Sequence, residues 1–436
     1  MFKRLAVVAA VLVAALSTAP AASAVPRAAA AAVDDFSLAV VPAAVTAVAG
    51  YPARLTVRTA TVSGAPQPVA LRVTGLPAGV FATVTPTTVT SGASAVVTVQ
   101  TSVSARAGTF TLVVEGVAAT LRHQAPARLA VRTPTAVRAA FYYPWFPEAW
   151  RQGGLNPYTN YLPSRGAYTV DQAVVRDQVA DMQYGGVTVG IASWFGQGTT
   201  TDRHWPAIMG GARGTGFAWA PYYEPEGRGR PTPDQIAADL HYLRSTYGGD
   251  RSSLAVLPGR GMVVFVYNAH DLDMADGCET INRWIRARTL LQQLWSESIY
   301  LNLKVFSGYR GCAGSATVDG WHQYAPASPE SDFSRVPGGA YTVSPGFWKA
   351  GLAYGRSPFL ARNLNRWRSG VARMTASGAF WQLVTTYNEW GEGTSIESSV
   401  GCRGAAPAGT LCDWSDAGRS DFITALHAAP LPGPAG

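Results

Sequence analysis

Residues 138–143 (RAAFYY), 187–193 (VTVGIAS) and 217–223 (FAWAPYY) decide the fold class, because each is a short apolar run rich in β-branched and aromatic residues. Such runs are typical of strands that are buried on both faces. Between the first two runs, the segment 169–184 carries its apolar residues on one face at helical spacing. A strand, a helix and a further strand in this order predict a parallel β/α unit.

The same alternation continues toward the end of the chain, where further helices are predicted at 233–244 and 360–375. Eight strands that alternate with helices predict an α/β fold, a (β/α)₈ TIM barrel over 137–430. The segment 323–339 is rich in Pro, Ser and Gly and has no clear helix, so the prediction of the sixth and seventh β/α units is weak. A doubly wound open sheet is the alternative. The five other predicted strands are 262–268 (MVVFVYN), 302–307 (NLKVFS), 316–322 (ATVDGWH), 340–344 (AYTVS) and 380–387 (FWQLVTTY).

Residues 35–132 follow a different pattern, with short Val- and Thr-rich stretches that alternate between apolar and polar residues. Period-two alternation between Gly- and Pro-containing turns predicts a small all-β sandwich. The turn at 75–80 (GLPAGV) resembles one that is common in bacterial immunoglobulin-like modules. Because this segment has no cysteine and few aromatic residues, we interpret it as a spacer or interaction module. A carbohydrate-binding module is the alternative.

The N-terminus predicts export. A basic start, a short apolar stretch and the small residues Ala22-Ser23-Ala24 are typical of a cleaved signal peptide, here 1–24. The apolar stretch is too short for a membrane span, which needs roughly 20 residues, so a membrane anchor is the weaker reading. Residues 25–34 are predicted to be an Ala-rich flexible tether. We therefore expect a secreted, extracellular protein without a membrane span.

The charge of the chain argues against nucleic acid as a partner. Lys and Arg number 35 against 27 Asp and Glu, a formal net charge of +8. These residues are spread along the chain without a run of five or six basic residues, so they do not form the footprint of a nucleic-acid-binding protein. We expect a monomer.

The four cysteines lie in the C-terminal part, and no two of them form a Cys-x-x-Cys pair. An even number of cysteines in an exported chain favours disulfides over a zinc site. Cys402 and Cys412 flank one short loop, which favours their pairing and leaves Cys278 with Cys312. Four cysteines nevertheless allow three pairings.

Aromatic, amide and carboxyl side chains gather at the carboxyl ends of the predicted strands, which is where a TIM barrel carries its active site. Aromatic rings stack on the apolar faces of sugars, while carboxylates and amides bond the sugar hydroxyls. We therefore predict a cleft for a polysaccharide or glycan. The predicted substrate-binding residues are Tyr143, Trp145, Trp194, Tyr223, Glu224, Tyr267, His322, Tyr324, Asn388 and Trp390.

Two carboxylates, Glu389 and Glu392, stand three residues apart in 387–394 (YNEWGEGT), where the last predicted strand ends. Glycoside hydrolysis usually requires two carboxyl groups that flank the scissile bond. The neighbouring glycines allow the backbone to turn both side chains toward one cavity. We predict that this pair is catalytic. For Glu397 we expect instead a surface charge or a helix-start residue.

Other chemistries lack their motifs. The chain has no Gly-x-Ser-x-Gly nucleophile elbow, no Walker-type phosphate loop and no His-Glu-x-x-His. His204, His270 and His322 lie in separate units without metal-ligand spacing. We therefore predict an enzyme without a cofactor and without a metal site.

Four stretches, 141–145 (FYYPW), 193–195 (SWF), 223–225 (YEP) and 388–397 (NEWGEGTSIE), resemble glycoside hydrolase family 99. This is the family of the endo-α-mannosidases and endo-α-mannanases. The resemblance covers roughly 137–428, with the motifs in matching order. It implies a (β/α)₈ barrel that cleaves α-linked glycans internally, with retention of anomeric configuration and without a cofactor.

The resemblance also implies individual roles. By motif position, Glu389 matches the residue that acts as a base on the sugar 2-hydroxyl, and Glu392 matches the general acid/base. Positions that line the sugar site in the family correspond to Tyr143, Trp194, Glu224 and Tyr324.

The chain departs from the family pattern at three positions. Tyr387 stands where the family usually has Trp, Gly391 where it often has His, and Ser398 where it has Pro. Both carboxylates remain, so the reaction type is better supported than the substrate. Mannan is implied by the resemblance, while an α-glucan or another bacterial envelope polysaccharide stays open.

Together these observations predict a secreted, retaining endo-glycosidase. The alternatives are a non-catalytic polysaccharide-binding protein on a barrel scaffold and an adhesion protein built on the β-sandwich.

Overall fold

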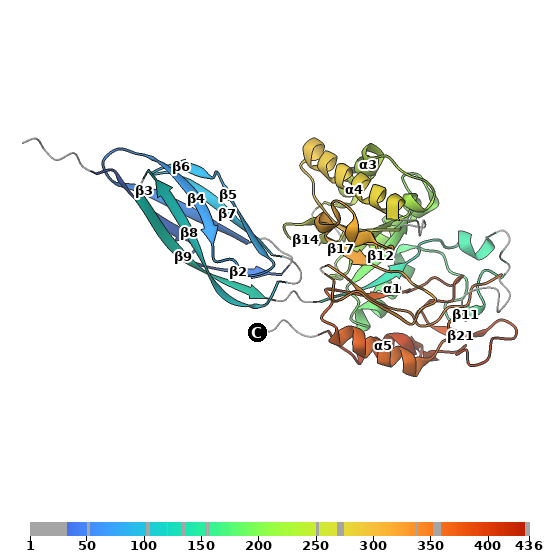
Figure 1. The fold of residues 1–436 in the computed structure, drawn as a ribbon. Coiled ribbons are helices and arrows are strands. Elements are labelled where there is room, and N and C mark those ends of the chain that lie inside the picture. Colours follow the sequence, from blue (N-terminus) through green and yellow to red (C-terminus); the bar gives the residue numbers. More distant parts are fainter. Residues whose placement is uncertain are drawn as a thin grey trace, which may run out of the picture.

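The chain divides into an N-terminal part made of β-sheets and a C-terminal part of mixed α/β structure (Figure 1). The predicted signal peptide (1–24) and nearly all of the predicted tether (25–34) lie outside the described residues. The computed structural model describes residues 33–49, 53–101, 105–119, 121–132, 136–152, 155, 157–249, 253–267, 274–336, 338–351 and 359–431.

The N-terminal part consists of two sheets in which neighbouring strands are antiparallel, except for the parallel pair β2 and β9. The first sheet has the order β1 (Asp35–Val41), β3 (Ala53–Ser63), β7 (Ser94–Thr101) and β5 (Val80–Thr85). The second has the order β2 (Ala44–Val48), β9 (Leu121–Arg132), β8 (Gly108–Ala118), β4 (Pro68–Thr74) and β6 (Thr88–Thr90).

Both sheets contribute to one apolar core. In β3 the side chains of Leu55 and Val57 are buried, whereas Arg54 and Arg58 are exposed. Successive residues of a strand point to opposite faces, so the period-two pattern of the sequence places one face of each sheet inward. Each fully buried aliphatic side chain contributes about 1.5–3 kcal/mol. This core is distinct from the apolar clusters of the C-terminal part.

The described C-terminal part contains a curled sheet of eight parallel strands. Trp321 of its end strand β17 forms a parallel bridge with Gly339, two residues before the other end strand, β19. Each predicted apolar run overlaps one of these strands. In pairing order they are β17 (Gly320–His322), β16 (Ile299–Lys304), β15 (Gly261–Val266), β13 (Ala218–Tyr223), β12 (Val189–Trp194), β10 (Val137–Tyr142), β20 (Trp381–Val384) and β19 (Tyr341–Val343).

Helices connect most of these strands. The Thr232 side chain caps α3 in a capping box with Gln235, and Pro233 is the first helical residue. Asp171 caps α1 by accepting hydrogen bonds from the backbone of Ala173 and Val174. The α-helices in the described ranges are α1 (Gln172–Tyr184), α2 (Thr200–Ala212), α3 (Pro233–Tyr247), α4 (Met274–Trp295), α5 (Leu364–Ala376) and α6 (Asp421–His427).

The expected alternation of strand and helix is interrupted after β16 and after β17. Between β16 and β19, the described residues form no α-helix. The Gly-, Ser- and Pro-rich sequence of this region explains the difference, since these residues have low helix propensity. The 3₁₀ turns η3 (Tyr309–Gly311) and η4 (Ser315–Thr317) and the short strand β18 (Glu330–Asp332), antiparallel to β19, are found there instead.

The remaining short elements lie in loops. They are η1 (Glu148–Arg151), β11 (Tyr161–Pro163), η2 (Pro225–Gly227), β14 (Val256–Leu257), β21 (Ser399–Cys402), β22 (Ser415–Asp416) and β23 (Arg419–Ser420).

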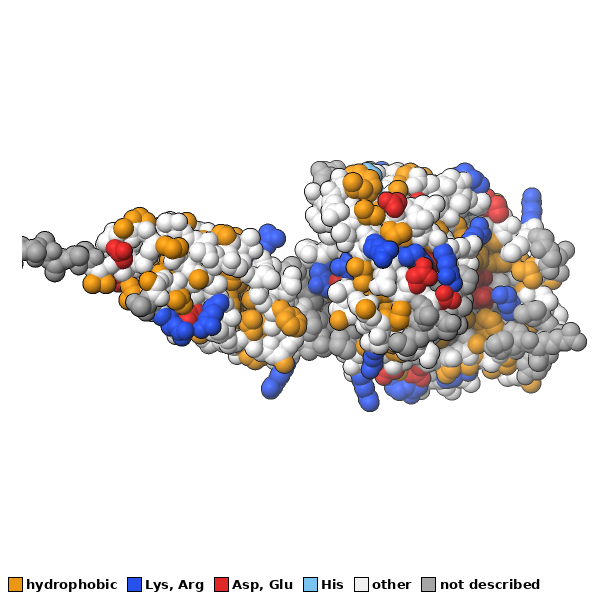
Figure 2. All heavy atoms as spheres, turned by 45° about the horizontal axis from the view of Figure 1, so that its top comes forward, with side chains coloured by type: hydrophobic (Ala, Val, Ile, Leu, Met, Phe, Trp, Pro, Cys, Tyr) orange, Lys and Arg blue, Asp and Glu red, His pale blue; other side chains and the backbone are white. Residues whose placement is uncertain are grey.

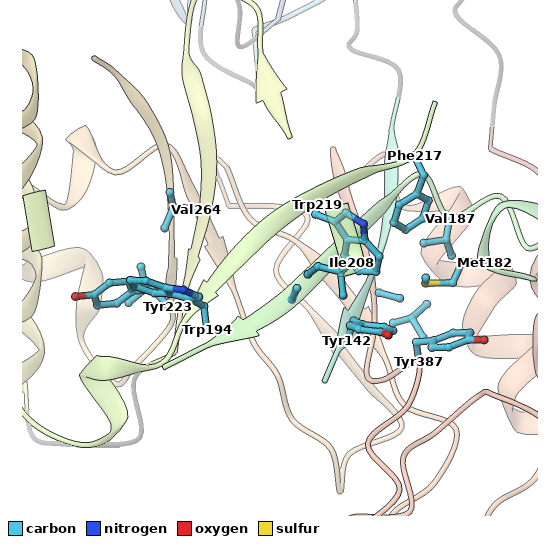
Figure 3. Close-up of a cluster of buried hydrophobic side chains, with 14 of the residues drawn as sticks. Tyr142, Met182, Val187, Trp194, Ile208, Phe217, Trp219, Tyr223, Val264 and Tyr387 are labelled. Carbon is cyan, nitrogen blue, oxygen red and sulfur yellow. The ribbon is translucent and has the colours of Figure 1, made fainter. Parts of the chain in front are cut away.

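The curled sheet has an apolar cluster on each face. In β10, Ala139 and Phe141 belong to one cluster, while Ala140 and Tyr142 belong to the other, which also contains helix residues. This alternation explains why the strands read as continuous apolar runs, since both of their faces are buried. Figure 3 shows part of the helix-packed cluster, in which Trp194 and Tyr223 lie together.

Both disulfides favoured by the sequence are present. Cys278 of α4 is bonded to Cys312, and Cys402 of β21 is bonded to Cys412. Their Cα atoms lie 5.2 and 5.0 Å apart, within the range that disulfides span. The first ties α4 to the turn after β16, and the second closes a loop of the C-terminal segment.

No helix in the part of the chain that the structure describes has the length and apolarity needed to cross a membrane. On the face that Figure 2 shows, Lys and Arg side chains occur on both parts of the chain, and some of them lie beside Asp and Glu side chains.

Candidate active site

A cavity of about 280 Å³ lies at the carboxyl ends of the parallel strands. Tyr143 follows β10, Glu224 follows β13, and Glu389 and Glu392 lie in the loop after β20. Parallel strands end at the same edge of a sheet, which brings residues together that are more than 200 positions apart. The lining residues are Tyr143, Trp145, Gln152, Leu155, Tyr158, Phe195, Glu224, Tyr267, Tyr324, Lys349, Glu389, Gly391 and Glu392.

Glu389 is held rigidly. Its Oε1 atom accepts hydrogen bonds from the Tyr158 hydroxyl and the Gly391 N–H, both at 2.9 Å. Its own N–H donates to the Thr386 hydroxyl at 2.8 Å. The buried Oε2 atom receives no hydrogen bond within the described residues. One carboxylate oxygen is therefore anchored, and the other is left to interact with a ligand.

The environment of Glu389 favours its protonated form. Burial raises the pKa of this carboxyl, and the negative charge of Glu392 raises it further. The Tyr158 hydroxyl and the backbone N–H groups of Gly391 and Glu392 act in the opposite direction, because they stabilise the carboxylate. The balance of these effects leaves the pKa above its usual range.

Glu392 has more contact with solvent, since its side chain is 25% exposed. Its Oε1 atom lies 3.4 Å from Lys349 Nζ, and its Oε2 atom accepts a hydrogen bond of 3.3 Å from the Tyr324 hydroxyl. The two carboxylates of the loop thus have unlike surroundings: a buried anchor for Glu389 and a half-open position beside a cation for Glu392.

Glu224 is a third carboxyl group of the cavity and is 4% exposed. Burial raises its pKa to about 8, while a hydrogen bond from Ser193 and the charge of Arg228 partly oppose this increase. The same Ser193 hydroxyl accepts a hydrogen bond of 3.2 Å from the indole N–H of Trp145. Near neutral pH, Glu224 is therefore mainly a hydrogen-bond donor to whatever occupies the cavity.

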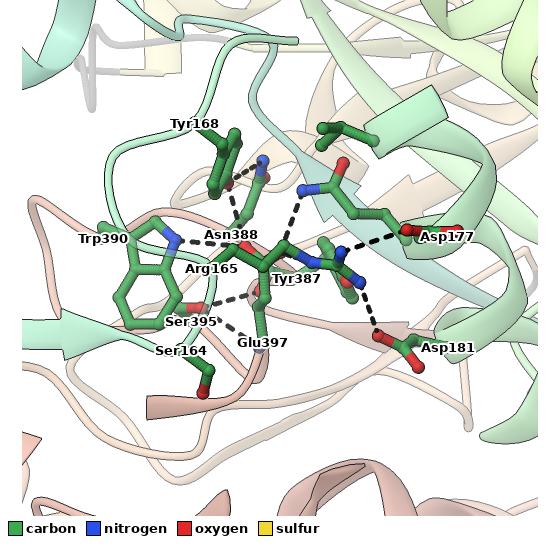
Figure 4. Close-up of polar contacts among 12 residues, drawn as sticks. Ser164, Arg165, Tyr168, Asp177, Asp181, Tyr387, Asn388, Trp390, Ser395 and Glu397 are labelled. Atoms are coloured by element: carbon green, nitrogen blue, oxygen red, sulfur yellow. Dashed lines mark hydrogen bonds and ion pairs between the residues drawn. The ribbon is translucent and has the colours of Figure 1, made fainter. Parts of the chain in front are cut away.

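The loop that carries the two glutamates is anchored by Glu397 beneath it (Figure 4). The carboxylate of Glu397 accepts hydrogen bonds from Gln178 Nε2 at 2.9 Å, the Tyr168 hydroxyl at 2.9 Å and the Trp390 indole N–H at 3.2 Å. It also forms an ion pair of 3.1 Å with Arg165 Nε. The expectation of a surface charge is wrong for Glu397, which is 2% exposed. Its surroundings come from segments far away in the sequence.

Asn388 joins this loop to the end of β10. Its Oδ1 atom accepts a hydrogen bond of 2.7 Å from the Tyr143 N–H, and its Nδ2 atom donates to the Tyr143 carbonyl at 3.0 Å. The amide group thereby satisfies both backbone groups of a residue that lines the cavity. Asn388 itself does not line the cavity, so it positions Tyr143 rather than contacting a ligand.

Four other residues that the sequence analysis expected at the substrate lie away from the cavity. Trp194 and Tyr223 end their strands with side chains on the helix-packed face, where they bond Asp202 and Asp239. Sequence position alone could not give this orientation, because a one-residue shift along a strand reverses the face. The remaining two are His322 and Trp390.

His322 points into the interior of the curled sheet. It is fully buried, and its Nδ1 atom lies 2.9 Å from Asn302 Oδ1. Burial and the nearby charge of Lys304 lower its pKa to about 3, so this histidine is neutral at physiological pH. Trp390 is turned away from the cavity toward Glu397.

The cavity also contains residues that the sequence analysis missed. Tyr158, Gln152 and Leu155 come from the long loop after β10, and Lys349 comes from the segment after β19. Their only signal was topological, since loops that follow barrel strands carry functional residues. No motif marks them. The predicted lining residues Tyr143, Trp145, Glu224, Tyr267, Tyr324, Glu389 and Glu392 do meet at this cavity.

In chemical terms, the cavity combines aromatic rings with three carboxyl groups and one lysine. Aromatic faces and carboxyl groups can bind a polyhydroxylated ligand, and carboxyl groups in unlike surroundings can act as base and acid. In the described ranges, no group of three or more His, Cys, Asp or Glu side chains is arranged to hold a metal ion.

The similarity to solved structures concerns the fold. No family model matches the sequence, and the comparison with curated proteins gives no match. Two structures of the GH99 endo-α-mannosidase of Bacteroides thetaiotaomicron, one in complex with bis-tris-propane, are similar to this chain with 18% and 17% sequence identity. Both have a TM-score of 0.51 and cover 66% of this chain and 95% of their own length. The C-terminal part therefore shares its mixed α/β fold with a glycoside hydrolase.

Proposed function

We propose that this protein is a glycoside hydrolase that cleaves internal α-glycosidic bonds of a polysaccharide or cell-envelope glycan with retention of configuration. Support comes from the fold shared with an endo-α-mannosidase and from the family resemblance of the stretch 388–397. The single observation that carries the proposal is the pair Glu389 and Glu392 in one aromatic cavity, with one oxygen of Glu389 anchored and the other without a hydrogen bond among the described residues.

In the proposed reaction, Glu389 removes the proton from the sugar 2-hydroxyl, whose oxygen attacks the anomeric carbon. Substrate-assisted routes of this kind are recognised exceptions to displacement by a carboxylate. A raised pKa suits this role, because a stronger base draws the proton more effectively. Tyr158 and Gly391 hold the carboxylate in a fixed orientation.

Glu392 donates a proton to the departing oxygen and then activates water. The burial of Glu389 and the negative charge of Glu392 favour a proton on Glu389 in the free protein. The productive form has this proton on Glu392 instead. We therefore propose that substrate binding moves it, because the sugar 2-hydroxyl donates a hydrogen bond to Glu389 and stabilises its carboxylate form.

The test measures reducing ends released by the full-length protein from α-mannan, α-glucan and envelope glycans. Glu389→Gln and Glu392→Gln are each expected to reduce the activity by about 10²–10⁴-fold, because this is the usual contribution of a general acid or base. Glu279→Gln is the matched control, because Glu279 lies on α4 outside the cavity with its side chain 53% exposed. A wild-type protein that binds these glycans without releasing reducing ends would instead support a sugar-binding protein.

Further parts of the proposal concern the rest of the chain. We propose that the curled sheet is a (β/α)₈ barrel over 137–430, in which no α-helix follows β16 or β17 among the described residues. Residues 35–132 would be an immunoglobulin-like spacer. We also propose that 1–24 are a cleaved signal peptide of a secreted monomer, with which the two disulfides are compatible. Mass spectrometry of the exported protein would locate its N-terminus.

A further inference from the structure

A second cavity, of about 530 Å³, adjoins the candidate active site. Trp145, Gln152 and Phe195 line both cavities, so a ligand can extend from one into the other across these side chains. The ring centroids of Trp145 and Phe195 are 6.3 Å apart, which gives the shared boundary an aromatic surface. The other lining residues are Glu148, Ala149, Thr199, Thr200, Thr201, Arg203 and Arg228.

Two arginines distinguish this cavity from the catalytic one. The guanidinium carbon of Arg228 lies 4.0 Å from the ring centroid of Phe195, a cation–π contact that helps to orient the group. Arg203 donates to the Gly198 carbonyl at 2.9 Å and to the Thr200 hydroxyl at 3.0 Å. Neither arginine forms an ion pair with a carboxylate among the residues that the structure describes. Both guanidinium groups thus keep donors for a ligand.

The other charges near the cavity do not cancel the two arginines. The N-terminus of α2 adds no free positive charge, because the Thr199 side chain caps the Asp202 N–H and the buried Asp202 carboxylate lies in the first turn. Glu148 is the one acidic side chain in the lining; it is 51% exposed and lies 3.6 Å from His204 Nε2. Within the lining, two arginines therefore outweigh one solvated carboxylate.

We propose that this second cavity is a subsite for a sugar that carries an oxyanion, either a phosphate or a carboxylate, next to the bond that is cleaved. The inference rests on the proposed function and narrows its substrate class to acidic glycans. The sugar ring stacks on Trp145 and Phe195, and the anion accepts hydrogen bonds from Arg203 and Arg228. Planar guanidinium groups suit both anions, because their paired N–H groups match the spacing of the oxygens.

Binding is tested with the full-length Glu392→Gln protein and three α-linked manno-oligosaccharides of equal length. One is neutral, one carries a phosphate monoester and one ends in a uronic acid. We expect calorimetry to give about tenfold tighter binding of at least one anionic form, since one charged hydrogen-bonded pair accounts for this factor. High salt is expected to reduce the preference. The two anionic arms distinguish phosphate from carboxylate recognition.

The variant Arg203→Gln/Arg228→Gln is expected to bind neutral and anionic forms with equal affinity. Arg213→Gln, which changes an arginine at the opposite end of α2, is the matched control and should keep the preference. Equal binding of all three ligands before substitution, or a preference that survives the double substitution, overturns the inference.

Native protein assayed in parallel for reducing ends separates this inference from the proposed function. Cleavage of neutral glycan without any preference for the anionic forms would support the proposed hydrolase and contradict the anion subsite. A binding preference that depends on the two arginines, without cleavage of any of the oligosaccharides, would support the anion site and contradict the proposed hydrolase.

Discussion

The hydroxyl of Tyr158 donates a hydrogen bond of 2.9 Å to Oε1 of Glu389, although the two residues are 231 positions apart in the chain. The loop after β10 and the loop after β20 meet at this contact because their strands are parallel neighbours. The bond has two consequences for the site. It fixes the orientation of the carboxylate, and it opposes the increase in pKa that burial produces.

Replacement of Tyr158 by Phe should therefore raise the pKa of Glu389 further. A hydrogen bond to a charged group is worth roughly 1.5–3 kcal/mol, so the shift is expected to be about one pH unit or more. If Glu389 acts as the base and holds the proton in the free protein, its pKa governs the alkaline limb of the kcat/KM profile, and this limb moves to higher pH by this amount. Tyr184→Phe, at the end of α1 and outside the cavity, should leave the profile unchanged. An unshifted limb in Tyr158→Phe would contradict the assignment of Glu389 as base.

The mechanism predicts different responses of the two glutamates to the leaving group. Glu392→Gln should recover part of its activity on an aryl glycoside with a good leaving group, because that group departs without a proton. Glu389→Gln should not recover, since its role concerns the 2-hydroxyl. A 2-deoxy substrate should bind without turnover. Comparable cleavage of the 2-deoxy substrate, or a sugar ester on Glu389 detected by mass spectrometry, would indicate ordinary covalent displacement.

The raised pKa of Glu224 predicts that the stability of the protein depends on pH. Its pKa is about 8 in the folded protein against 4.5 as the ordinary value, so between these values the folded state holds a proton that the unfolded state has lost. Stability from this group is complete below pH 4.5 and declines by about 1.4 kcal/mol per pH unit as the pH rises toward 8.

Denaturant unfolding across this range measures the slope. Glu224→Gln cannot titrate, so its free energy of unfolding should fall less steeply with pH than that of the native protein. Glu279→Gln should follow the native protein. Parallel slopes for the native protein and Glu224→Gln would mean that Glu224 is ionised in the folded state at neutral pH.

Replacement of Glu397, which lies outside the cavity, is expected to lower the free energy of unfolding strongly. Glu397→Gln replaces a buried carboxylate by an amide with a single acceptor oxygen and leaves Arg165 without its buried partner, which should cost about 3–5 kcal/mol. Asp177→Asn removes another contact of the same Arg165, at 3.4 Å, but its side chain is 68% exposed. This control should cost less than about 1 kcal/mol. Equal free energies of unfolding for the two variants would contradict the anchoring role of Glu397.

The separate apolar cores predict that the two parts of the chain fold independently. A chain that begins at Pro134 should fold and keep its activity on soluble glycan, because its core and both of its disulfides lie within the C-terminal part. Thermal unfolding and reducing-end release measure the two properties. An insoluble or inactive C-terminal part, compared with an active full-length protein, would show that residues 35–132 are more than a spacer.

The sequence by itself determined where the strands lie and where the catalytic candidates stand. The eight apolar runs overlap the eight strands, because burial on both faces requires continuous apolar residues. The helix at Thr232 and Pro233 begins where its local capping residues place it, since a cap involves neighbours within one turn. These features depend on interactions close in sequence, which local patterns record.

Only the tertiary structure decided which side chains reach the cavity. The rings of Trp194 and Tyr223 lie on the helix-packed face of the sheet, whereas the ring of Tyr143 lies on the other face. The twist and register of neighbouring strands set this difference. Glu397 reads as a surface charge because its partners Arg165, Tyr168 and Gln178 lie more than 200 positions away. Tyr158 and Lys349 carry no motif at all. Their contact with the catalytic pair exists only because the curled sheet brings the carboxyl ends of its parallel strands to one edge.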